Sequence, residues 1–191
     1  MILYRVLHNV GFRPGLRRVL RMDVTGTEHV PSAGPVILVA NHESIYDPWV
    51  LGVVTERQIR YIAKAELWRY PVVRSLMDGF GCIPIERGGG DVLAMTRVVE
   101  ALHRDEVIGF FPQGTTKRDR PRRFHRGAAR LALQTGAPIV PVLLTGTRGI
   151  LKPGLPHVEA HVRPPIRVEP ARPTVAAARD LTARIEEVLM G

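Results

Sequence analysis

An imidazole and a carboxylate, those of His42 and Asp47, stand five positions apart in the segment Asn41-His-Glu-Ser-Ile-Tyr-Asp47. A neutral imidazole can take a proton from a hydroxyl near neutral pH, and a carboxylate on its other nitrogen fixes the tautomer and stabilises the imidazolium. The segment follows the apolar run of residues 36–40, so the pair is expected at the end of a strand. The chemistry indicated is the activation of an alcohol as a nucleophile.

The five-residue spacing excludes one continuous helix. Five helical positions rotate by about 500°, which leaves the two side chains roughly 140° apart. We therefore predict a tight turn through residues 43–46 and a helix that begins at Asp47-Pro48, where proline takes a favoured first position. In the simplest alternative, Asp47 is only a helix N-cap and His42 only a loop histidine.

Two other side chains could act as nucleophiles. Ser44 lies two residues after His42, but no Gly-x-Ser-x-Gly elbow surrounds it, so we predict a role in the turn. Cys82, the single cysteine, lies in the apolar run of residues 81–85 with no base beside it, so we expect a small buried side chain. A single cysteine also excludes a disulfide framework and a cysteine-based metal site.

The elements that must position these residues are typical of one α/β domain. The chain has 191 residues, and its 18 glycines and 16 prolines divide it into apolar runs that alternate with helical patterns. Strands are expected over residues 22–27, 36–40, 59–63, 83–85, 107–111 and 139–144, with one or two more between 158 and 168. Helices are expected from Pro48, from Ala65, and over residues 72–79, 91–102, 127–135 and 174–190.

Three loops follow predicted strands: residues 41–47, 86–90 and 112–117. In α/β sheets the ligand crevice lies beyond the carboxyl ends of the strands. We therefore expect these three loops to converge on one site.

The charge of the chain indicates an anionic partner. The net charge is +9, and residues 117–130 hold seven basic side chains against Asp119 alone. An anionic membrane, the phosphates of coenzyme A and an acidic carrier protein would all suit. Nucleic acid is the weaker alternative, because aromatic residues make up only 6% of the chain and no nucleic-acid-binding module is recognisable.

The first 22 residues form a basic amphipathic segment with five arginines and no acidic side chain. Gly11 and Pro14-Gly15 predict two short helices, and the arginines exclude a membrane-spanning helix. No signal-peptide cleavage pattern is present. We expect residues 1–21 to form an arm that contacts an anionic membrane and residues 22–191 to form the enzymatic domain. Alternatively, the arm only packs its apolar side on the core.

Six segments between residues 22 and 170 resemble the glycerolipid acyltransferase family, which includes the lysophosphatidate acyltransferases. The segment Asn41 to Asp47 resembles the first block of that family, in which four residues separate histidine from aspartate. The others are Lys64-Ala-Glu-Leu67, Gly81-Cys-Ile-Pro-Ile-Glu-Arg87, Phe111-Pro-Gln-Gly-Thr115, Phe124-His-Arg-Gly-Ala-Ala-Arg130 and Ala137-Pro-Ile-Val-Pro-Val142. Their shared order and intervals make the resemblance specific.

The resemblance implies a mixed, largely parallel central sheet flanked by helices, with an N-terminal amphipathic helical arm. It implies an enzyme of phospholipid biosynthesis, peripheral on the cytoplasmic face of the cell membrane. Such an enzyme moves a fatty acyl group from acyl-CoA or acyl carrier protein to the free hydroxyl of a lysophospholipid, above all lysophosphatidate. No metal or redox cofactor is implied.

The resemblance also implies roles for particular residues. His42 is expected to be the base and Asp47 to orient it, while Arg87 binds phosphate. Backbone donors in the loop of residues 113–115 are candidates for stabilising the oxyanion or for binding the anionic group of the acceptor. The expected substrate-binding residues are Asn41, Ser44, Lys64, Arg87, Gln113, Gly114, Thr115 and Thr116.

The third block departs from the family pattern at two positions. Gln113 replaces the usual glutamate, and Thr116 replaces the usual arginine. One negative and one positive charge are lost together, and Lys117 or Arg118 could supply the missing cation. Two alternatives therefore stay open: a different hydroxylated lipid as acceptor, or a catalytically impaired member that only binds lipid.

Overall fold

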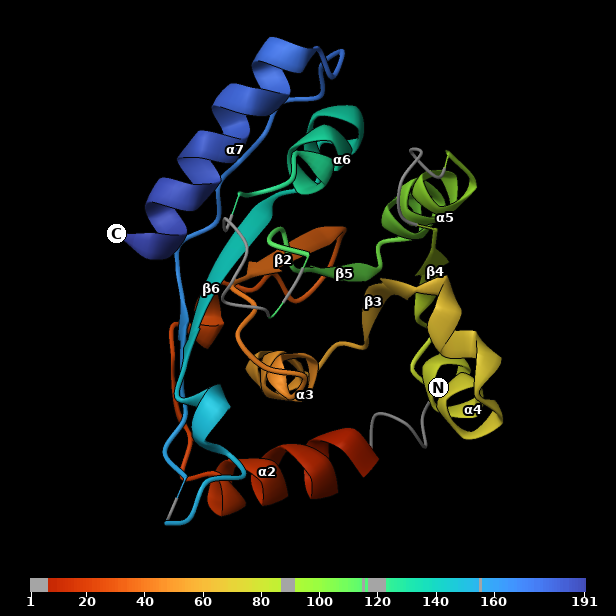
Figure 1. Cartoon of the computed structure of the whole chain (residues 1–191). Helices are drawn as coiled ribbons and strands as arrows, with labels where there is room; N and C mark the ends of the chain where they lie inside the picture. Colours follow the sequence, from red (N-terminus) through yellow and green to blue (C-terminus); the bar gives the residue numbers. More distant parts are fainter. Residues whose placement is uncertain (1–6, 87–91, 115, 117–122, 155) are drawn as a thin grey trace.

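The computed structural model describes residues 7–86, 92–114, 116, 123–154 and 156–191. Its centre is a seven-stranded sheet in the order β1-β7-β6-β2-β5-β3-β4 (Figure 1). Neighbouring strands are parallel, except that β6 and β7 are antiparallel. The prediction of a mixed, largely parallel sheet flanked by helices is confirmed.

The strands agree closely with the predicted apolar runs. They are β1 (Asp23–Thr25), β2 (Val36–Ala40), β3 (Ile59–Lys64), β4 (Ile83–Ile85), β5 (Val107–Phe110), β6 (Ile139–Thr145) and β7 (Glu159–Val162). Between residues 158 and 168 the chain forms β7 and a single further bridge, from Ile166 to Ile139. Pro164-Pro165 separates the two, because proline has no N–H to donate to a strand ladder.

The helical segments alternate with the strands as an α/β chain requires. They are η1 (Leu7–Phe12), α2 (Arg13–Val19), η2 (Thr27–His29), α3 (Asp47–Leu51), η3 (Gly52–Val54), η4 (Ala65–Arg69), α4 (Pro71–Gly79), α5 (Val92–His103), α6 (Gly127–Thr135), η5 (Thr147–Gly149) and α7 (Val175–Met190). The predicted helix near Ala65 is a 3-10 helix. Thr174 caps α7 by accepting a hydrogen bond from Ala177 N.

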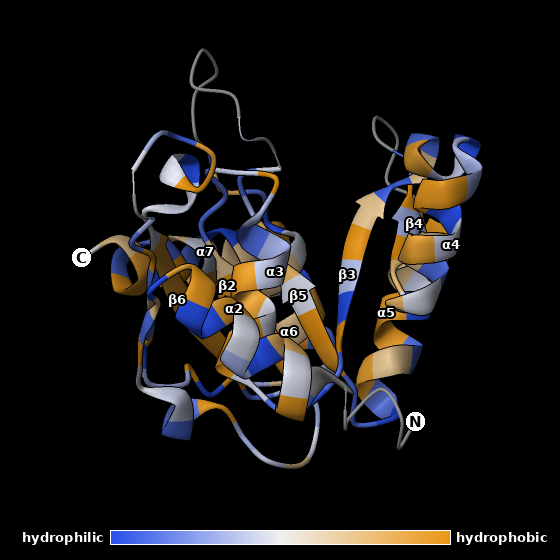
Figure 2. Cartoon of the chain, turned by 90° about the horizontal axis from the view of Figure 1, so that it is seen from below, coloured by the Kyte–Doolittle hydropathy of each residue, from blue (hydrophilic) through white to orange (hydrophobic). Residues whose placement is uncertain are grey.

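The core has two apolar layers, one on each face of the sheet. Helices α5, α6 and α7 cover one face, and α3 with the end of the arm covers the other. Figure 2 shows α2 and α3 lying over the central strands, whose residues are largely apolar. Strand β2 is buried at all five positions, as expected for a parallel strand covered on both sides.

The arm differs from its prediction in one respect. Its described part is helical without a break from Leu7 to Val19, since Phe12 keeps helical backbone angles and Pro14 falls in the first turn of α2. Arg13 fixes the arm to the domain by donating to Val53 O at 3.1 Å and pairing with Glu56 at 3.3 Å. The arm thus does pack on the core, with Leu16 against the apolar layer that contains α3.

Candidate active site

His42 and Asp47 are in direct contact at the carboxyl end of β2. Nδ1 of His42 lies 2.8 Å from Oδ2 of Asp47, and the Asp47 side chain is fully buried. The His42 side chain keeps about a fifth of its surface exposed, 19%. Because Asp47 occupies Nδ1, the imidazole presents Nε2 on the opposite side of its ring.

The turn between the two residues is built around the Asp47 carboxylate. Oδ2 also accepts hydrogen bonds from Glu43 N at 2.6 Å and Ser44 N at 2.7 Å. Helix α3 begins at Asp47, with Pro48 in its first turn as predicted. One side chain therefore holds both the ring of His42 and the loop that carries it.

Asn41 and Gln113 fix the position of the His42 backbone. The Asn41 amide donates to Leu144 O at 2.8 Å and accepts from Leu144 N at 2.7 Å, so it continues the pairing of β2 with β6. Gln113 Oε1 accepts the N–H of His42 at 2.6 Å. Both side chains are buried, and neither lines the pocket described below. In the structure these two side chains hold the backbone at the start of the loop, and their predicted contact with substrate stays a prediction.

Ser44 takes the turn role that its sequence context favoured. Its hydroxyl accepts the N–H of Tyr46 at 3.3 Å, and it does not line the pocket. Gly114 and Thr116, by contrast, do line the pocket beside His42. The Gly114 N–H, one of the backbone donors predicted for the oxyanion, donates to Phe111 O at 3.1 Å within its own turn.

Lys64 lies at the end of β3 and reaches the same pocket. Its side chain is about half exposed and stands 4.0 Å from Glu66. Arg87 and Thr115, two further predicted site residues, lie outside the described residues, as do Lys117 and Arg118. Of the three predicted loops, the structure therefore brings together the first and the third.

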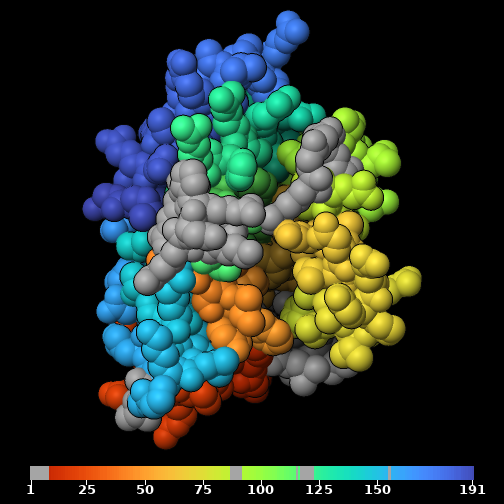
Figure 3. Space-filling model, viewed as in Figure 1, coloured from red at the N-terminus to blue at the C-terminus, as the bar shows by residue number. Residues whose placement is uncertain are grey.

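His42 stands at one end of an apolar pocket of about 490 Å³. Strand β3 lines it with Ile59, Tyr61 and Ala63, and α3 adjoins the strand with Pro48 and Trp49. Figure 3 shows the hollow between α3 (orange) and the η4–α4 segment (yellow). The volume lies within the usual range for small-molecule sites.

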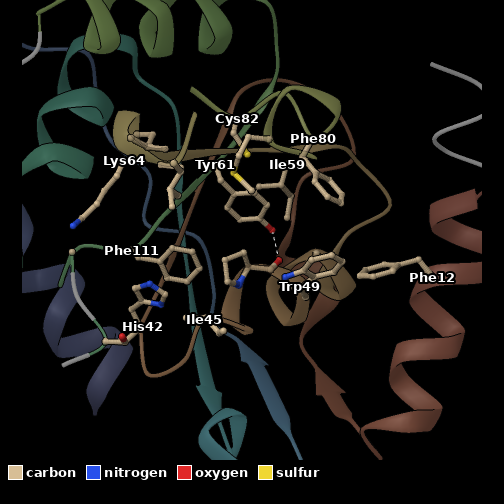
Figure 4. A pocket seen from close by; sticks show the side chains of 18 of the residues that line it. Phe12, His42, Ile45, Trp49, Ile59, Tyr61, Lys64, Phe80, Cys82 and Phe111 are labelled. Atoms are coloured by element: carbon tan, nitrogen blue, oxygen red, sulfur yellow. Dashed lines mark hydrogen bonds between the residues drawn. The ribbon is translucent and has the colours of Figure 1, made fainter. Parts of the chain in front are cut away.

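Aromatic rings line the pocket along its length, as Figure 4 shows. Phe111 stacks on His42 with ring centroids 4.4 Å apart. At the far end, the Trp49 ring packs against Phe12 of the arm and against Phe80, with ring centroids 5.8 Å and 5.6 Å apart. The groove follows β3, whose six residues span about 17 Å at roughly 3.3 Å per residue. An extended hydrocarbon chain would suit this shape.

Sequence reasoning did not identify these lining residues as part of the site. Apolar side chains on strands and helices give the same pattern whether they face a core or a pocket. The sequence could have placed Phe111 at the site, because it opens the third block directly after β5. No sequence pattern could have placed Phe12, Trp49 and Phe80 there, since they meet only through the packing of three separate elements.

Two polar lining residues have pKa values shifted by burial. Desolvation lowers the pKa of Arg57, and the negative charge of Asp105 partly opposes that change. The Arg57 guanidinium donates to the carbonyl oxygens of Pro31, Gly34 and Asp105. Burial raises the pKa of the Cys82 thiol, because desolvation disfavours the thiolate. Cys82 is therefore neutral near pH 7, and it lines the pocket as a partly buried side chain, not the fully buried one that was predicted.

The arrangement is chemically suited to activating a hydroxyl next to an apolar chain. A buried carboxylate holds the imidazole, and the opposite ring nitrogen can accept a proton. Among the described residues, no three His, Cys, Asp or Glu side chains are grouped as a metal site would require.

Comparison with known proteins gives the same family as the sequence blocks. A model of the acyltransferase family matches residues 21–145. A 1-acyl-sn-glycerol-3-phosphate acyltransferase of Brassica napus is 31% identical over 145 residues, which are 74% of this chain and 42% of that protein. A lyso-ornithine lipid O-acyltransferase of Pseudomonas aeruginosa is 34% identical over 128 residues, 66% of this chain and 47% of that protein.

The fold also has a solved counterpart. The structure of a 1-acyl-sn-glycerophosphate acyltransferase from Thermotoga maritima superposes with a TM-score of 0.74, covering 93% of this chain and 73% of that one at 24% identity. The match to each of the two sequence relatives spans less than half of the relative's length. The family match covers well over half of the present chain, and the chain therefore belongs to the acyltransferase family.

Proposed function

We propose that this protein transfers a fatty acyl group from a thioester to the free hydroxyl of a lysophospholipid, with lysophosphatidate as the first candidate. The observation that carries this proposal is the placement of His42, held by Asp47, at one end of an apolar pocket of about 490 Å³. A base beside a long apolar pocket is what acyl transfer to a hydroxyl requires.

In the proposed reaction, His42 Nε2 takes the proton of the acceptor hydroxyl while the hydroxyl oxygen attacks the thioester carbonyl. A C–O bond forms, the C–S bond breaks, and the imidazolium returns the proton to the leaving thiolate. Asp47 keeps Nδ1 protonated and stabilises the imidazolium. No acyl-enzyme, metal or redox cofactor is needed, because a thioester is already activated.

The apolar pocket is proposed to hold the fatty chain of a substrate. Its lining is largely apolar and aromatic from His42 to Phe12. Among the described lining residues, the basic side chains are those of His42, Arg57 and Lys64. The Arg57 guanidinium already donates to three backbone carbonyl oxygens. The donor carrier, coenzyme A or acyl carrier protein, would bind outside this pocket.

Membrane contact is proposed for the arm, on the cytoplasmic face, with residues 22–191 as the enzymatic domain. Val10 and Val19 are exposed at 74% and 69%, and Arg17 and Arg18 are exposed beside them. The lipid substrates would thus reach the pocket from the bilayer. None of the helices in the described ranges has the length and apolar character of a membrane span.

Two observations favour a second class of acceptor, a hydroxylated lipid other than lysophosphatidate. The third block carries Thr116 where the family pattern has arginine, and one relative is named for acylation of a lyso-ornithine lipid. We therefore propose to test several acceptors: lysophosphatidate, lysophosphatidylethanolamine, lyso-ornithine lipid and monoacylglycerol.

The decisive experiment measures product formation from labelled acyl-CoA, or acyl carrier protein, with each acceptor in mixed micelles. Wild-type protein should yield a diacyl product. His42→Ala should lower the rate by roughly 10²- to 10⁴-fold, the usual contribution of a general base. His103→Ala, at the exposed end of α5, is the matched control and should change nothing.

Two outcomes would contradict the proposal. Lipid binding without product in the wild-type protein would identify a lipid-binding member of the family. Product formation that survives His42→Ala at the wild-type rate would remove His42 from the role of base.

A further inference from the structure

Arg148 reaches the candidate active site from an element outside all the sequence blocks. It lies in η5, directly after β6. Nε of Arg148 stands 3.5 Å from Oε2 of Glu43, the residue next to His42. Nη2 donates to the carbonyl oxygen of Thr116, a pocket-lining residue, at 3.3 Å. One guanidinium thus contacts both loops beside His42.

The backbone directs Arg148 to this position. Gly146 turns the chain after β6 with φ +78°, and a Cβ atom there would collide with the carbonyl oxygen of His157. Thr147 is buried beneath the turn at 1% exposure. The turn is therefore fixed by packing, and it aims the following side chain back across the end of the sheet.

Neither contact of Arg148 has the strength expected of a structural ion pair. The Arg148 and Glu43 side chains are each 26% exposed, and their separation of 3.5 Å is long for a charge-assisted hydrogen bond. The guanidinium is consequently available to exchange Glu43 for a stronger anionic partner.

The sequence of the third block leaves a place for such a cation, because Thr116 stands where the family pattern has arginine. An anionic acceptor needs a positive group near its hydroxyl, and position 116 offers only threonine. Arg148 places a guanidinium against the backbone oxygen of that same residue. An arginine 32 positions later in the chain thus brings a positive charge to the backbone of this loop.

We propose that Arg148 binds the phosphate of the acceptor lipid and thereby determines headgroup specificity, an inference that rests on the proposed function. The planar guanidinium can bind two phosphate oxygens at once. Glu43 holds the guanidinium near Thr116, and the phosphate replaces Glu43 when the acceptor binds. The acceptor hydroxyl is then presented to His42, the neighbour of Glu43.

Binding, measured apart from turnover, tests this inference. Affinity for lysophosphatidate and for monoacylglycerol in neutral micelles is followed by the fluorescence of Trp49 in the pocket. Arg148→Met should weaken lysophosphatidate binding at least tenfold and leave monoacylglycerol binding within about twofold. Arg148→Lys should fall between the two, since lysine keeps the charge and loses the fork.

Glu43→Gln is the matched variant on the other side of the ion pair. Removing the competing carboxylate should tighten lysophosphatidate binding several-fold, whereas a purely structural clamp would be weakened equally by either change. Circular dichroism and thermal midpoints confirm that each variant is folded.

The inference is overturned if Arg148→Met weakens both lipids equally, or if Glu43→Gln weakens lysophosphatidate binding as much as Arg148→Met does. Failure of the proposed function has a different signature. A wild-type protein that binds lysophosphatidate through Arg148 but transfers no acyl group to any acceptor would contradict the proposed acyl transfer. The same result would support Arg148 as the phosphate-binding residue.

Discussion

The Asp47 carboxylate organises the candidate site at the scale of single residues. Its Oδ2 atom accepts three hydrogen bonds, from the ring of His42 and from two backbone N–H groups. The same group therefore sets the tautomer of the base and the shape of its loop. Gln113 adds a fourth restraint from the neighbouring loop, through the N–H of His42.

Two substitutions of Gln113 should show whether its side-chain oxygen, and not its lack of charge, is what holds the His42 N–H. Gln113→Glu keeps an oxygen acceptor for the His42 N–H, so the rate of acyl transfer should stay within about fivefold of wild type. Gln113→Met removes the acceptor, and we expect a loss of about 1–3 kcal/mol in the free energy of unfolding. The rate with Met should fall about tenfold or more, because the base is no longer held in place. Urea titrations and initial rates measure both effects, and a Met variant indistinguishable from wild type would refute the positioning role.

Cys82 should report on occupancy of the pocket. Burial raises the pKa of its thiol above the ordinary value of about 8.5, so alkylation by iodoacetamide should be slow at pH 8 and accelerate only at higher pH. A bound lysolipid should slow the reaction further, because Cys82 lines the pocket.

The raised pKa of Cys82 also makes the free energy of unfolding depend on pH. The unfolded chain loses the thiol proton first as pH rises. The contribution of Cys82 to the free energy of unfolding is therefore intact below the unfolded pKa and declines from there up to the folded pKa. Cys82→Ala is the control for stability and should remove that decline. Alkylation at pH 8 as fast as in the urea-unfolded chain would contradict the partial burial of Cys82.

At the scale of elements, the pocket depends on how β3 and β5 pair. Tyr61 stands opposite Gly109 in this pair, and its hydroxyl donates to Pro48 O at 2.6 Å. A Cβ atom on Gly109 would lie 2.6 Å from the Tyr61 ring. The glycine therefore makes room for the aromatic wall of the pocket.

Gly109→Ala should test this pairing. Overpacking should cost about 1–3 kcal/mol in the free energy of unfolding and push the Tyr61 ring towards the pocket. We expect transfer of long acyl chains to lose more rate than transfer of short ones. Gly79→Ala, where a Cβ atom meets nothing within 4 Å, is the matched control. Equal losses for all chain lengths would show that the ring does not narrow the groove.

At the scale of the whole molecule, basic and apolar groups coincide on the arm. The chain carries a net charge of +9, and the arm packs one side on the domain while Val10 and Val19 stay exposed. The arm also contributes Phe12 to the far end of the pocket. Membrane contact and pocket shape are therefore proposed to be coupled through one segment.

Vesicle binding should depend on the arm and on salt. Replacing Arg17 and Arg18 together by glutamine should cost about 2 kcal/mol at low salt, or roughly thirtyfold in affinity for vesicles with phosphatidylglycerol. The same double change at Arg172 and Arg184 serves as control. Both are exposed, in or just before α7, which covers the other face of the sheet from the arm. Flotation assays measure both. Equal effects from the two pairs would mean that only total charge matters.

The sequence by itself determined the fold class, the position of nearly every strand, and the His42–Asp47 pair. These features depend on local patterns: apolar runs of strand length, helix starts, and a five-residue spacing that only a turn could bring together. The spacing excluded a continuous helix, and the structure has the predicted turn followed by α3.

Only the tertiary structure decided which polar residues hold the site and which face the pocket. Gln113 reaches His42 across 71 positions, and Asn41 reaches Leu144 across 103, so no local pattern separates these positioning residues from substrate contacts. The aromatic groove and the approach of Arg148 to Thr116 likewise arise where separate elements pack together. Such contacts depend on the register of the sheet and the tilt of helices, which no short stretch of sequence fixes.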